Sequence, residues 1–204
     1  GSGMHTNISL FRGQENAFFD PDTHMHISDL ARFFVGGLIE HSCAITAVAN
    51  PLINSYKRLV SGFEAPVYIT WSGPNRSSLI RIPSGRGLST RIEFRSPDPS
   101  CNPYLTFAAI LAAGLDGIKR GIDPGEPVDL NVYHLTPAER AARGIKTLPA
   151  NLKEALDCLE ADSVIRAALG EHVFQNIMRL GMMEWEAYNT FVHPWEIERY
   201  INTF

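Results

Sequence analysis

"RIEFR", residues 91–95, alternates charged and apolar side chains, as a β-strand with two different faces does. Side chains two residues apart share a face of a strand, so Arg91, Glu93 and Arg95 lie on one side and the two apolar residues on the other. The apolar side predicts contact with a hydrophobic core. Three charges on the opposite side, a carboxylate between two cations, indicate a candidate site for anions or a metal ion.

Other segments upstream also have the composition or alternation of short strands: residues 4–11, 67–71 and 77–83. In the first of them, His5, Asn7 and Ser9 share a polar face. Turn-rich stretches separate the strands between residues 67 and 95, so we expect three successive antiparallel neighbours there.

Helices are expected mainly in the second half of the chain. Asn102 can cap an apolar helix that begins at Pro103 and ends before Gly121. Further helices are expected after the capping residues Asn151 and Asp162, over about 171–190 and from Pro194, with Trp185 and Trp195 as packing anchors. A helix capped by Ser28 should run to about His41. Strands followed by helices, without βαβ alternation, predict an α+β fold.

The composition is that of an ordinary globular protein. The chain has 204 residues, of which 45% are hydrophobic and 20% charged. The net charge of -4 leaves no broad basic field, so no nucleic-acid partner is expected. No apolar run approaches the roughly 20 residues that cross a bilayer, and no signal peptide is visible. Three scattered cysteines suit a reducing cytosol, so we expect a cytoplasmic protein without membrane contact.

Arginines are concentrated in the region of the predicted strands: Arg58, Arg76, Arg81, Arg91 and Arg95. Surface ion pairing explains any single one of them. As a set they suit bidentate binding of carboxylate and phosphate groups. Their mutual repulsion requires an anion, or a carboxylate such as Glu93, among them.

Four features near these arginines each have two interpretations. Glu93 either neutralises its neighbours or is an oxygen ligand for Mg²⁺ or Mn²⁺. His5 is either a structural hydrogen-bonding residue or a nitrogen ligand of the same ion. Glu64, in the loop SGFEAP, is either solvated or a general base on a lid. Residues 24–26, HMH, have no third metal ligand nearby in the sequence, so we interpret them as a surface turn.

Several stretches, in order and at compatible spacing, resemble type I (bacterial) glutamine synthetase: GSGMHTNISL, NSYKRLVSGFEAP, NRSSLIRIP, TRIEFRSPDPSCNPYLTFAAILAAGLDGI and HPWEIERY. The match is to the C-terminal part of the catalytic domain and covers the whole chain. It implies antiparallel strands of a partial catalytic barrel, mainly in residues 1–100, and a mainly helical half in residues 101–204. It also implies that the opening GSGM is native, and that the family's N-terminal β-grasp domain and the first part of its catalytic domain are absent.

The resemblance implies a glutamate–ammonia ligase. The family phosphorylates glutamate with ATP to γ-glutamyl phosphate, which ammonia attacks, and two divalent ions, Mg²⁺ or Mn²⁺, bridge the substrates. The implied assembly is a homo-oligomer of twelve subunits, whose C-terminal helix reaches into the opposite ring. A fragment with about half of the active site is expected to be inactive alone.

Residue roles follow from the resemblance by position. His5 and Glu93 match metal ligands, and Glu64 and Arg76 match catalytic residues. Glu64 closes the site and helps to deprotonate ammonium, and Arg76 stabilises charge during phosphoryl transfer. Glutamate-binding positions are Gly1, Arg58, Glu64, Arg76 and Arg95. ATP-binding positions are Asn7, Ser9, Arg76, Arg81, Arg86 and Arg91.

The chain departs from the family pattern at three positions. Ser61 replaces the usual proline of the loop that carries Glu64, which should loosen this loop. Asn7 stands where part of the family has a second histidine. Tyr133 aligns with a tyrosine that is adenylylated in some members, but its flanking residues differ, so we expect no modification.

Two alternatives stay open. A γ-glutamyl ligase that uses an organic amine often lacks the glutamate at position 64, so Glu64 argues against it. The second is a non-catalytic scaffold related to glutamine synthetase; His5, Glu93 and the arginines argue against loss of activity in this half, but not in the half that the chain does not contain.

Overall fold

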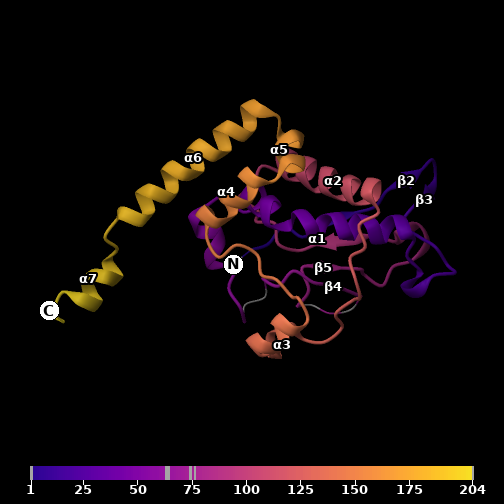
Figure 1. Cartoon of the computed structure of the whole chain (residues 1–204), viewed down its shortest axis with the longest axis horizontal. Helices are drawn as coiled ribbons and strands as arrows, with labels where there is room; N and C mark the ends of the chain where they lie inside the picture. Colours follow the sequence, from indigo (N-terminus) through magenta and orange to yellow (C-terminus); the bar gives the residue numbers. More distant parts are fainter. Residues whose placement is uncertain (1, 63–64, 74, 76, 204) are drawn as a thin grey trace.

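The computed structural model describes residues 2–62, 65–73, 75 and 77–203. About half of the chain is helical, and the strands are short (Figure 1). The strands are β1 (Thr6–Ile8), β2 (Phe11–Arg12), β3 (Glu15–Asn16), β4 (Trp71–Ser72), β5 (Ile80–Arg81) and β6 (Ile92–Phe94). The helices are α1 (Asp29–Ala49), α2 (Pro103–Arg120), α3 (Pro137–Ala142), α4 (Leu152–Ala161), α5 (Ser163–Leu169), α6 (Glu171–Thr190) and α7 (Pro194–Tyr200). The mixed composition confirms the α+β prediction.

The described strands form an open four-stranded sheet in the order β1-β6-β5-β4 and a separate β2-β3 hairpin. β6 lies between β1 and β5 and is antiparallel to both. All three residues of β6 are buried. Ile92 and Phe94 lie in the hydrophobic core, and Glu93 faces other charged groups. The charged face predicted from RIEFR therefore exists, but Glu93 and Arg95 on it are buried.

The prediction of antiparallel neighbours from residue 67 to residue 95 is wrong for one pair, because β4 and β5 are parallel. The chain leaves the sheet at Gly73 and is held outside it at Asn75. The Asn75 amide donates to the carbonyls of Val128 and Leu130. The chain then re-enters the sheet in its original direction, so the connection is an excursion and not a tight hairpin turn. The segment 67–69 pairs instead with residues 146–148, which the sequence did not identify as extended.

Helices α1 and α2 pack so closely that glycine is required where they cross (Figure 1). A Cβ atom on Gly37 would lie 2.0 Å from the carbonyl oxygen of Ala113. A Cβ atom on Gly117 would lie 2.1 Å from the carbonyl oxygen of Phe33. Gly36 and Gly37 weaken α1 as an isolated helix, but they allow neighbouring backbone to approach it closely. Helix α1 continues to Ala49, beyond the end expected at His41.

A buried histidine links the helical layer together. His41 of α1 accepts or donates hydrogen bonds at both ring nitrogens, with Asp162 at 2.6 Å and Asp116 of α2 at 3.0 Å. Asp162 also caps α5 by accepting from two backbone N–H groups. Burial opposes the charged form of the imidazole, but the two carboxylates outweigh it and raise the pKa of His41 above its usual value. The charged histidine therefore joins α1, α2 and the start of α5.

The predicted caps and ends of the later helices are confirmed. Asn102 caps α2, Asn151 caps α4, and α6 spans the residues expected. One packing expectation is wrong: Trp185 packs partly against the core, but Trp195 is 63% exposed. Trp195 belongs to α7, which ends an arm extending away from the body of the molecule (Figure 1).

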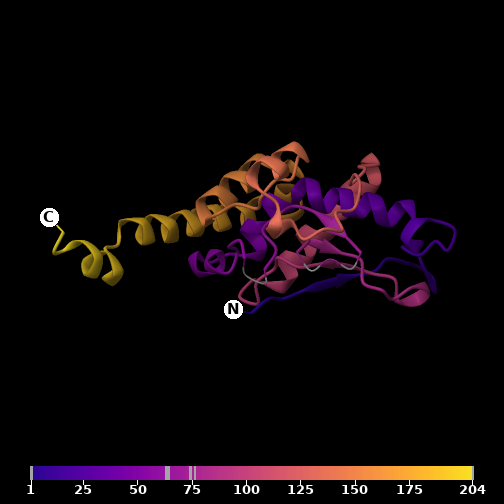
Figure 2. The same ribbon diagram turned by 90° about the horizontal axis from the view of Figure 1, so that it is seen from below.

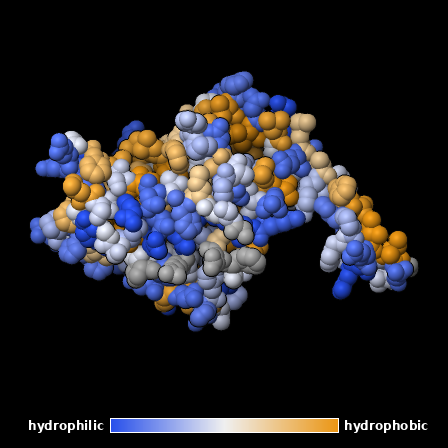
Figure 3. Space-filling model, turned by 180° about the vertical axis from the view of Figure 1, so that it is seen from behind, coloured by the Kyte–Doolittle hydropathy of each residue, from blue (hydrophilic) through white to orange (hydrophobic). Residues whose placement is uncertain are grey.

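Apolar side chains are exposed on two parts of this chain. Several lie on the arm: Leu180, Met183, Phe191, Val192, Trp195, Ile197 and Ile201. Figure 3 shows apolar atoms at the tip of this arm. Others lie on one stripe of α2: Tyr104, Phe107, Leu111 and Leu115.

Figure 2 shows α4 and α5, in orange, on the opposite side of the body from the N-terminal strand. No helix among the described residues has both the length and the apolarity to span a membrane.

Replacing Gly37 with alanine should lower the free energy of unfolding by at least about 2 kcal/mol, because the new methyl group meets backbone that cannot rotate away. Gly181→Ala is the matched control, since its methyl group would meet only the Leu156 side chain. The control should be near neutral or stabilising by up to about 1 kcal/mol from helix propensity. Urea unfolding followed by circular dichroism measures both changes; equal effects would contradict the close contact.

His41→Gln should destabilise the protein more at pH 5.5 than at pH 9. The pKa of His41 is raised on folding, so its contribution is complete below the unfolded value of about 6.5 and is lost as the pH rises through the folded value. The pKa values of Asp116 and Asp162 are lowered by the same pairing, so their contribution is lost only in acid. Unfolding free energies of both proteins across this range test the sign, and a pH-independent difference would exclude a charged His41.

Candidate functional site

The register of the sheet brings three predicted site residues side by side. Glu93 of β6 lies opposite Asn7 of β1 on one side and opposite Arg81 of β5 on the other. Directly opposed residues on a sheet have Cβ atoms about 5 Å apart and point to the same face. The face therefore carries a carboxylate between an amide and a guanidinium, at the centre of the sheet.

Two of the predicted groups lie against the Glu93 carboxylate. His5 Nδ1 lies 3.1 Å from Glu93 Oε1, and Arg81 Nε lies 2.5 Å from Glu93 Oε2. The side chain of Glu93 is only 7% exposed. The Arg81 contact is a charge contact without hydrogen-bond alignment, so Oε2 is buried without a hydrogen bond. A buried carboxylate oxygen in this state has capacity to bind a further donor or a cation.

The surroundings of His5 favour the neutral form of its imidazole, which is the form that binds metal ions. Partial burial and the nearby charge of Arg95 lower the pKa of His5, although Glu93 opposes this shift. The imidazole is therefore neutral at neutral pH, and its contact with Glu93 is a hydrogen bond rather than an ion pair. A neutral imidazole beside a carboxylate matches the ligand preference of Mn²⁺ and also accommodates Mg²⁺.

Arg58 and Arg95 lie next to this pair and are oriented by backbone carbonyls. Arg95 is buried, and its Nη1 donates to the Ser78 carbonyl at 3.1 Å. Arg58 donates to the carbonyls of Ser96 at 2.9 Å and Arg95 at 3.2 Å. A Cβ atom on Gly3 would lie 2.9 Å from Nη2 of Arg58, so the N-terminal segment passes directly over this guanidinium. The Arg58 guanidinium thus lies against the backbone of Arg95.

Asn7 and Ser9 are tied to the strand that carries Glu93. Asn7 Oδ1 accepts from Arg91 Nε at 3.1 Å, and Ser9 donates to the Thr90 carbonyl at 2.8 Å. Arg91 also donates to the Ser89 carbonyl. These contacts fix the orientation of the Arg91 guanidinium relative to the sheet.

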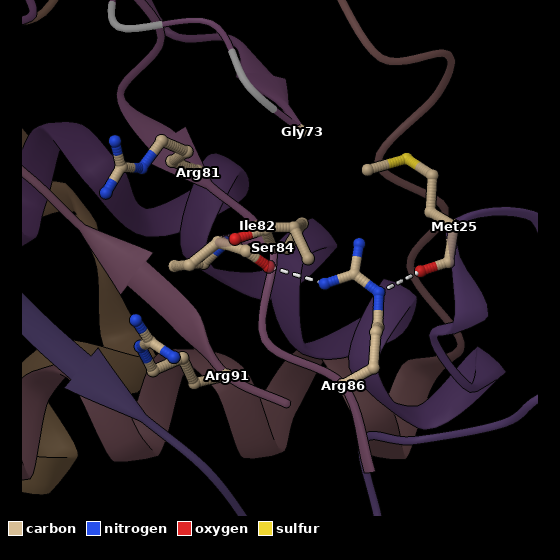
Figure 4. A pocket seen from close by; sticks show the side chains of 8 residues that line it. Met25, Gly73, Arg81, Ile82, Ser84, Arg86 and Arg91 are labelled. Carbon is tan, nitrogen blue, oxygen red and sulfur yellow. Dashed lines mark hydrogen bonds between the residues drawn. The ribbon is translucent and has the colours of Figure 1, made fainter. Parts of the chain in front are cut away.

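A pocket of about 460 Å³ adjoins the charged face (Figure 4). It is lined by Met25, Gly73, Arg81, Ile82, Pro83, Ser84, Arg86 and Arg91. In Figure 4, Arg81 and Arg91 lie on one side of it, with Met25 and Arg86 on the other. Three of the predicted ATP-binding residues therefore share one pocket, which combines guanidinium groups with apolar wall.

Three predicted residues, Gly1, Glu64 and Arg76, lie outside the part of the chain that the structure describes. The loop that carries Glu64 has described contacts on both sides of it. The Ser61 hydroxyl lies 3.0 Å from that of Tyr68, and Tyr133 donates to the Ala65 carbonyl at 2.9 Å. Ser61, expected to loosen this loop, therefore has a hydrogen-bond partner that a proline could not have.

Among the described residues, no group of three or more His, Cys, Asp or Glu side chains is arranged so that it could hold a metal ion. His5 and Glu93 fit a divalent ion through a neutral imidazole and an orphaned buried carboxylate oxygen, but they supply only two ligands. Alone, these two residues would hold a divalent ion from one side only.

Met25 is one of the pocket residues that the sequence did not reveal. The stretch HMH, interpreted as a surface turn, forms a short 3₁₀ turn, η1 (His24–His26), whose central side chain lines the pocket. The turn-rich composition of DPDTHMH indicated an irregular segment but not its position.

Comparison with known proteins shows the family to which the chain is similar. The family model described as "Glutamine synthetase, catalytic domain" matches residues 1–200. The chain is 57% identical over 202 residues to a glutamine synthetase of Methanosarcina mazei, covering 99% of this chain and 45% of that protein. It is 56% identical over 201 residues to the enzyme of Thermotoga maritima, with 98% and 46% covered. The chain thus spans about half the length of the curated relatives it matches.

Solved structures show the same similarity in three dimensions. A structure titled "Apo GmaS without ligand" superposes with a TM-score of 0.83 at 38% identity, covering 99% of this chain and 45% of that one. A structure titled "GmaS/ADP complex-Conformation 1" superposes with a TM-score of 0.86 at 38% identity, with 99% and 46% covered. The chain belongs to the glutamine synthetase catalytic-domain family and corresponds to a C-terminal part of it.

Proposed function

We propose that this chain is the C-terminal portion of the catalytic domain of a glutamate–ammonia ligase, which makes glutamine by way of γ-glutamyl phosphate. The observation that carries this proposal is the buried Glu93 carboxylate, with His5 on one oxygen and Arg81 beside the other. Structural similarity to GmaS bound to ADP adds support for a nucleotide site. The sheet of this chain then forms part of the family's catalytic barrel.

The charges of the site suit the two substrates. Arg58 and Arg95 would hold the carboxylates of glutamate through bidentate contacts. Arg81 and Arg91 would hold the phosphates of ATP in the adjoining pocket. Magnesium or manganese, held by His5 and Glu93 together with further ligands, would neutralise phosphate charge.

During phosphoryl transfer, negative charge builds up on the transferred group. Arg76 and Arg81 would stabilise this charge from fixed positions, which lowers the barrier without reorganisation. Glu64 would take a proton from ammonium, so that neutral ammonia attacks the acyl phosphate. Asn7 and Ser9 would complete the nucleotide side of the site, and Arg86 lines the pocket next to them.

The exposed apolar surfaces of the chain support a larger assembly. The arm of α6 and α7 and the stripe on α2 leave several large apolar side chains in solvent. We propose that they are covered in a homo-oligomer, with twelve subunits as in the family, and that the isolated chain is inactive.

Glu93→Gln in the full-length protein that carries this chain should weaken Mn²⁺ binding at least about tenfold, because one anionic ligand is lost. His5→Ala should have a similar effect. Glu15→Gln, on the surface hairpin, is the matched control and should bind as the wild type does. Isothermal titration with Mn²⁺ measures all three proteins, and unchanged affinity in Glu93→Gln would remove Glu93 from the metal site.

The choice of nitrogen substrate separates the proposal from its main alternative. The full-length protein with glutamate, ATP and Mg²⁺ should form glutamine from ammonium with a higher kcat/KM than it forms a γ-glutamylamide from methylamine. Preference for methylamine would support the amine ligase instead. Absence of turnover with either substrate would favour a non-catalytic scaffold.

A further inference from the structure

The turn that brings Met25 to the pocket has an unfavourable backbone conformation. Met25 and His26 both have positive φ angles, 62° and 54°, in the left-handed region that residues with a Cβ atom seldom adopt. Such residues persist only where surrounding contacts impose them, and they concentrate at functional sites. The contacts that hold the turn in this conformation therefore indicate which part of the molecule the turn serves.

Local contacts hold both sides of the turn. The Thr23 hydroxyl donates to the Ile27 carbonyl at 2.5 Å, and His26 Nδ1 lies 2.9 Å from the Pro21 carbonyl oxygen. These bonds close the loop from Pro21 to Ile27 onto itself. They do not connect it to the pocket.

Arg86 supplies that connection. Its Nε donates to the Met25 carbonyl at 2.7 Å, across 61 positions of sequence. Its Nη1 donates to the carbonyls of Pro83 at 2.5 Å and Gly85 at 2.8 Å. Three of the five N–H groups of the guanidinium thus join the turn at Met25 to residues 83–86, a loop that lines the pocket. The guanidinium of Arg86 therefore holds the turn against the pocket loop, and only the two N–H groups of Nη2 remain for other partners.

The Met25 side chain forms the wall opposite the cations. It extends toward Gly73, where a Cβ atom would lie 3.1 Å from the Met25 methyl carbon (Figure 4). Arg81 and Arg91 lie on the other side of the pocket. A molecule with phosphates at one end and a flat aromatic ring at the other fits this polarity, since a thioether makes favourable contacts with aromatic rings.

We propose that Met25 is the wall against which the nucleobase packs, and that Arg86 is a positioning residue that holds this wall in place. This inference rests on the proposed function, because it takes the pocket as the ATP site. It differs from the role implied by family resemblance, in which Arg86 binds ATP directly.

Met25→Gly gives a clean test in the full-length enzyme, because glycine accepts the positive φ angle without strain while the wall is removed. The Kd for ATP should rise roughly three- to tenfold, as expected for loss of a sulfur–aromatic contact. The Kd for inorganic tripolyphosphate, which has no base, should stay within about twofold of the wild type. Equal weakening of both ligands, or no weakening of ATP, would overturn the proposal.

Arg86→Lys and Arg86→Gln distinguish positioning from charge. Lysine keeps the charge but cannot reach three carbonyls from one planar group, so both variants should raise the KM for ATP and leave kcat and the KM for glutamate near wild type. Tripolyphosphate affinity that falls in Arg86→Gln and survives in Arg86→Lys would make Arg86 a phosphate ligand and refute the inference. Arg12→Lys, exposed on the surface hairpin, is the matched control.

The double variant Met25→Gly with Arg86→Lys tests the connection between the two residues. If Arg86 acts through Met25, the second change should add no further loss of ATP affinity to the first. Additive losses would show separate roles. If the wild-type enzyme binds no ATP, the proposed function itself is wrong. If the wild-type enzyme binds ATP and the variants bind it equally well, only the inference about Met25 and Arg86 is wrong.

Discussion

The buried carboxylate of Glu93 is the charge on which the surrounding sheet depends. It lies on the central strand β6, with Arg81 and His5 against its two oxygens and buried Arg95 two residues along. Guanidinium groups in such positions are tolerated only with a counter-charge, because removing one partner of a buried pair commonly costs about 3–5 kcal/mol. Ile92 and Phe94 bury the opposite face of the same strand. A shift of one residue would put Glu93 in the core and Phe94 in the site, so the core and the charges enforce one register.

The end of α1 connects the helical layer to this sheet. Asn50, the C-cap residue, has its Oδ1 3.5 Å from Arg58 Nη1, and the Ala49 carbonyl accepts from Asp98 N beyond β6. The position of α1 is in turn fixed by its glycine contacts with α2 and by His41 between two carboxylates. Close helix packing thus determines where the last turn of α1 meets the arginine cluster.

Much of this arrangement was predictable from local sequence signals, and the remainder depended on distant contacts. The caps at Asn102, Asn151 and Asp162 are encoded within a few residues, so the helix starts were predicted correctly. Alternation in RIEFR gave the two faces of β6. The parallel pairing of β4 and β5 depends on Asn75 reaching carbonyls more than 50 positions away, which no local pattern records. Met25 was missed for the same reason, since its conformation is held by Arg86.

Several arginines of the site have fixed orientations but are held by neutral oxygens rather than by carboxylates. Arg58 and Arg91 are held by backbone carbonyl oxygens, and Arg91 also by the Asn7 amide oxygen. Neutral oxygens satisfy the directional needs of a guanidinium but leave its positive charge largely uncancelled. Arg81, by contrast, lies against Glu93 and is partly neutralised by it. Under the proposed function, Arg58 and Arg91 would present their charge to anionic substrates at orientations set before the substrates bind, which is the condition under which electrostatic stabilisation costs no reorganisation.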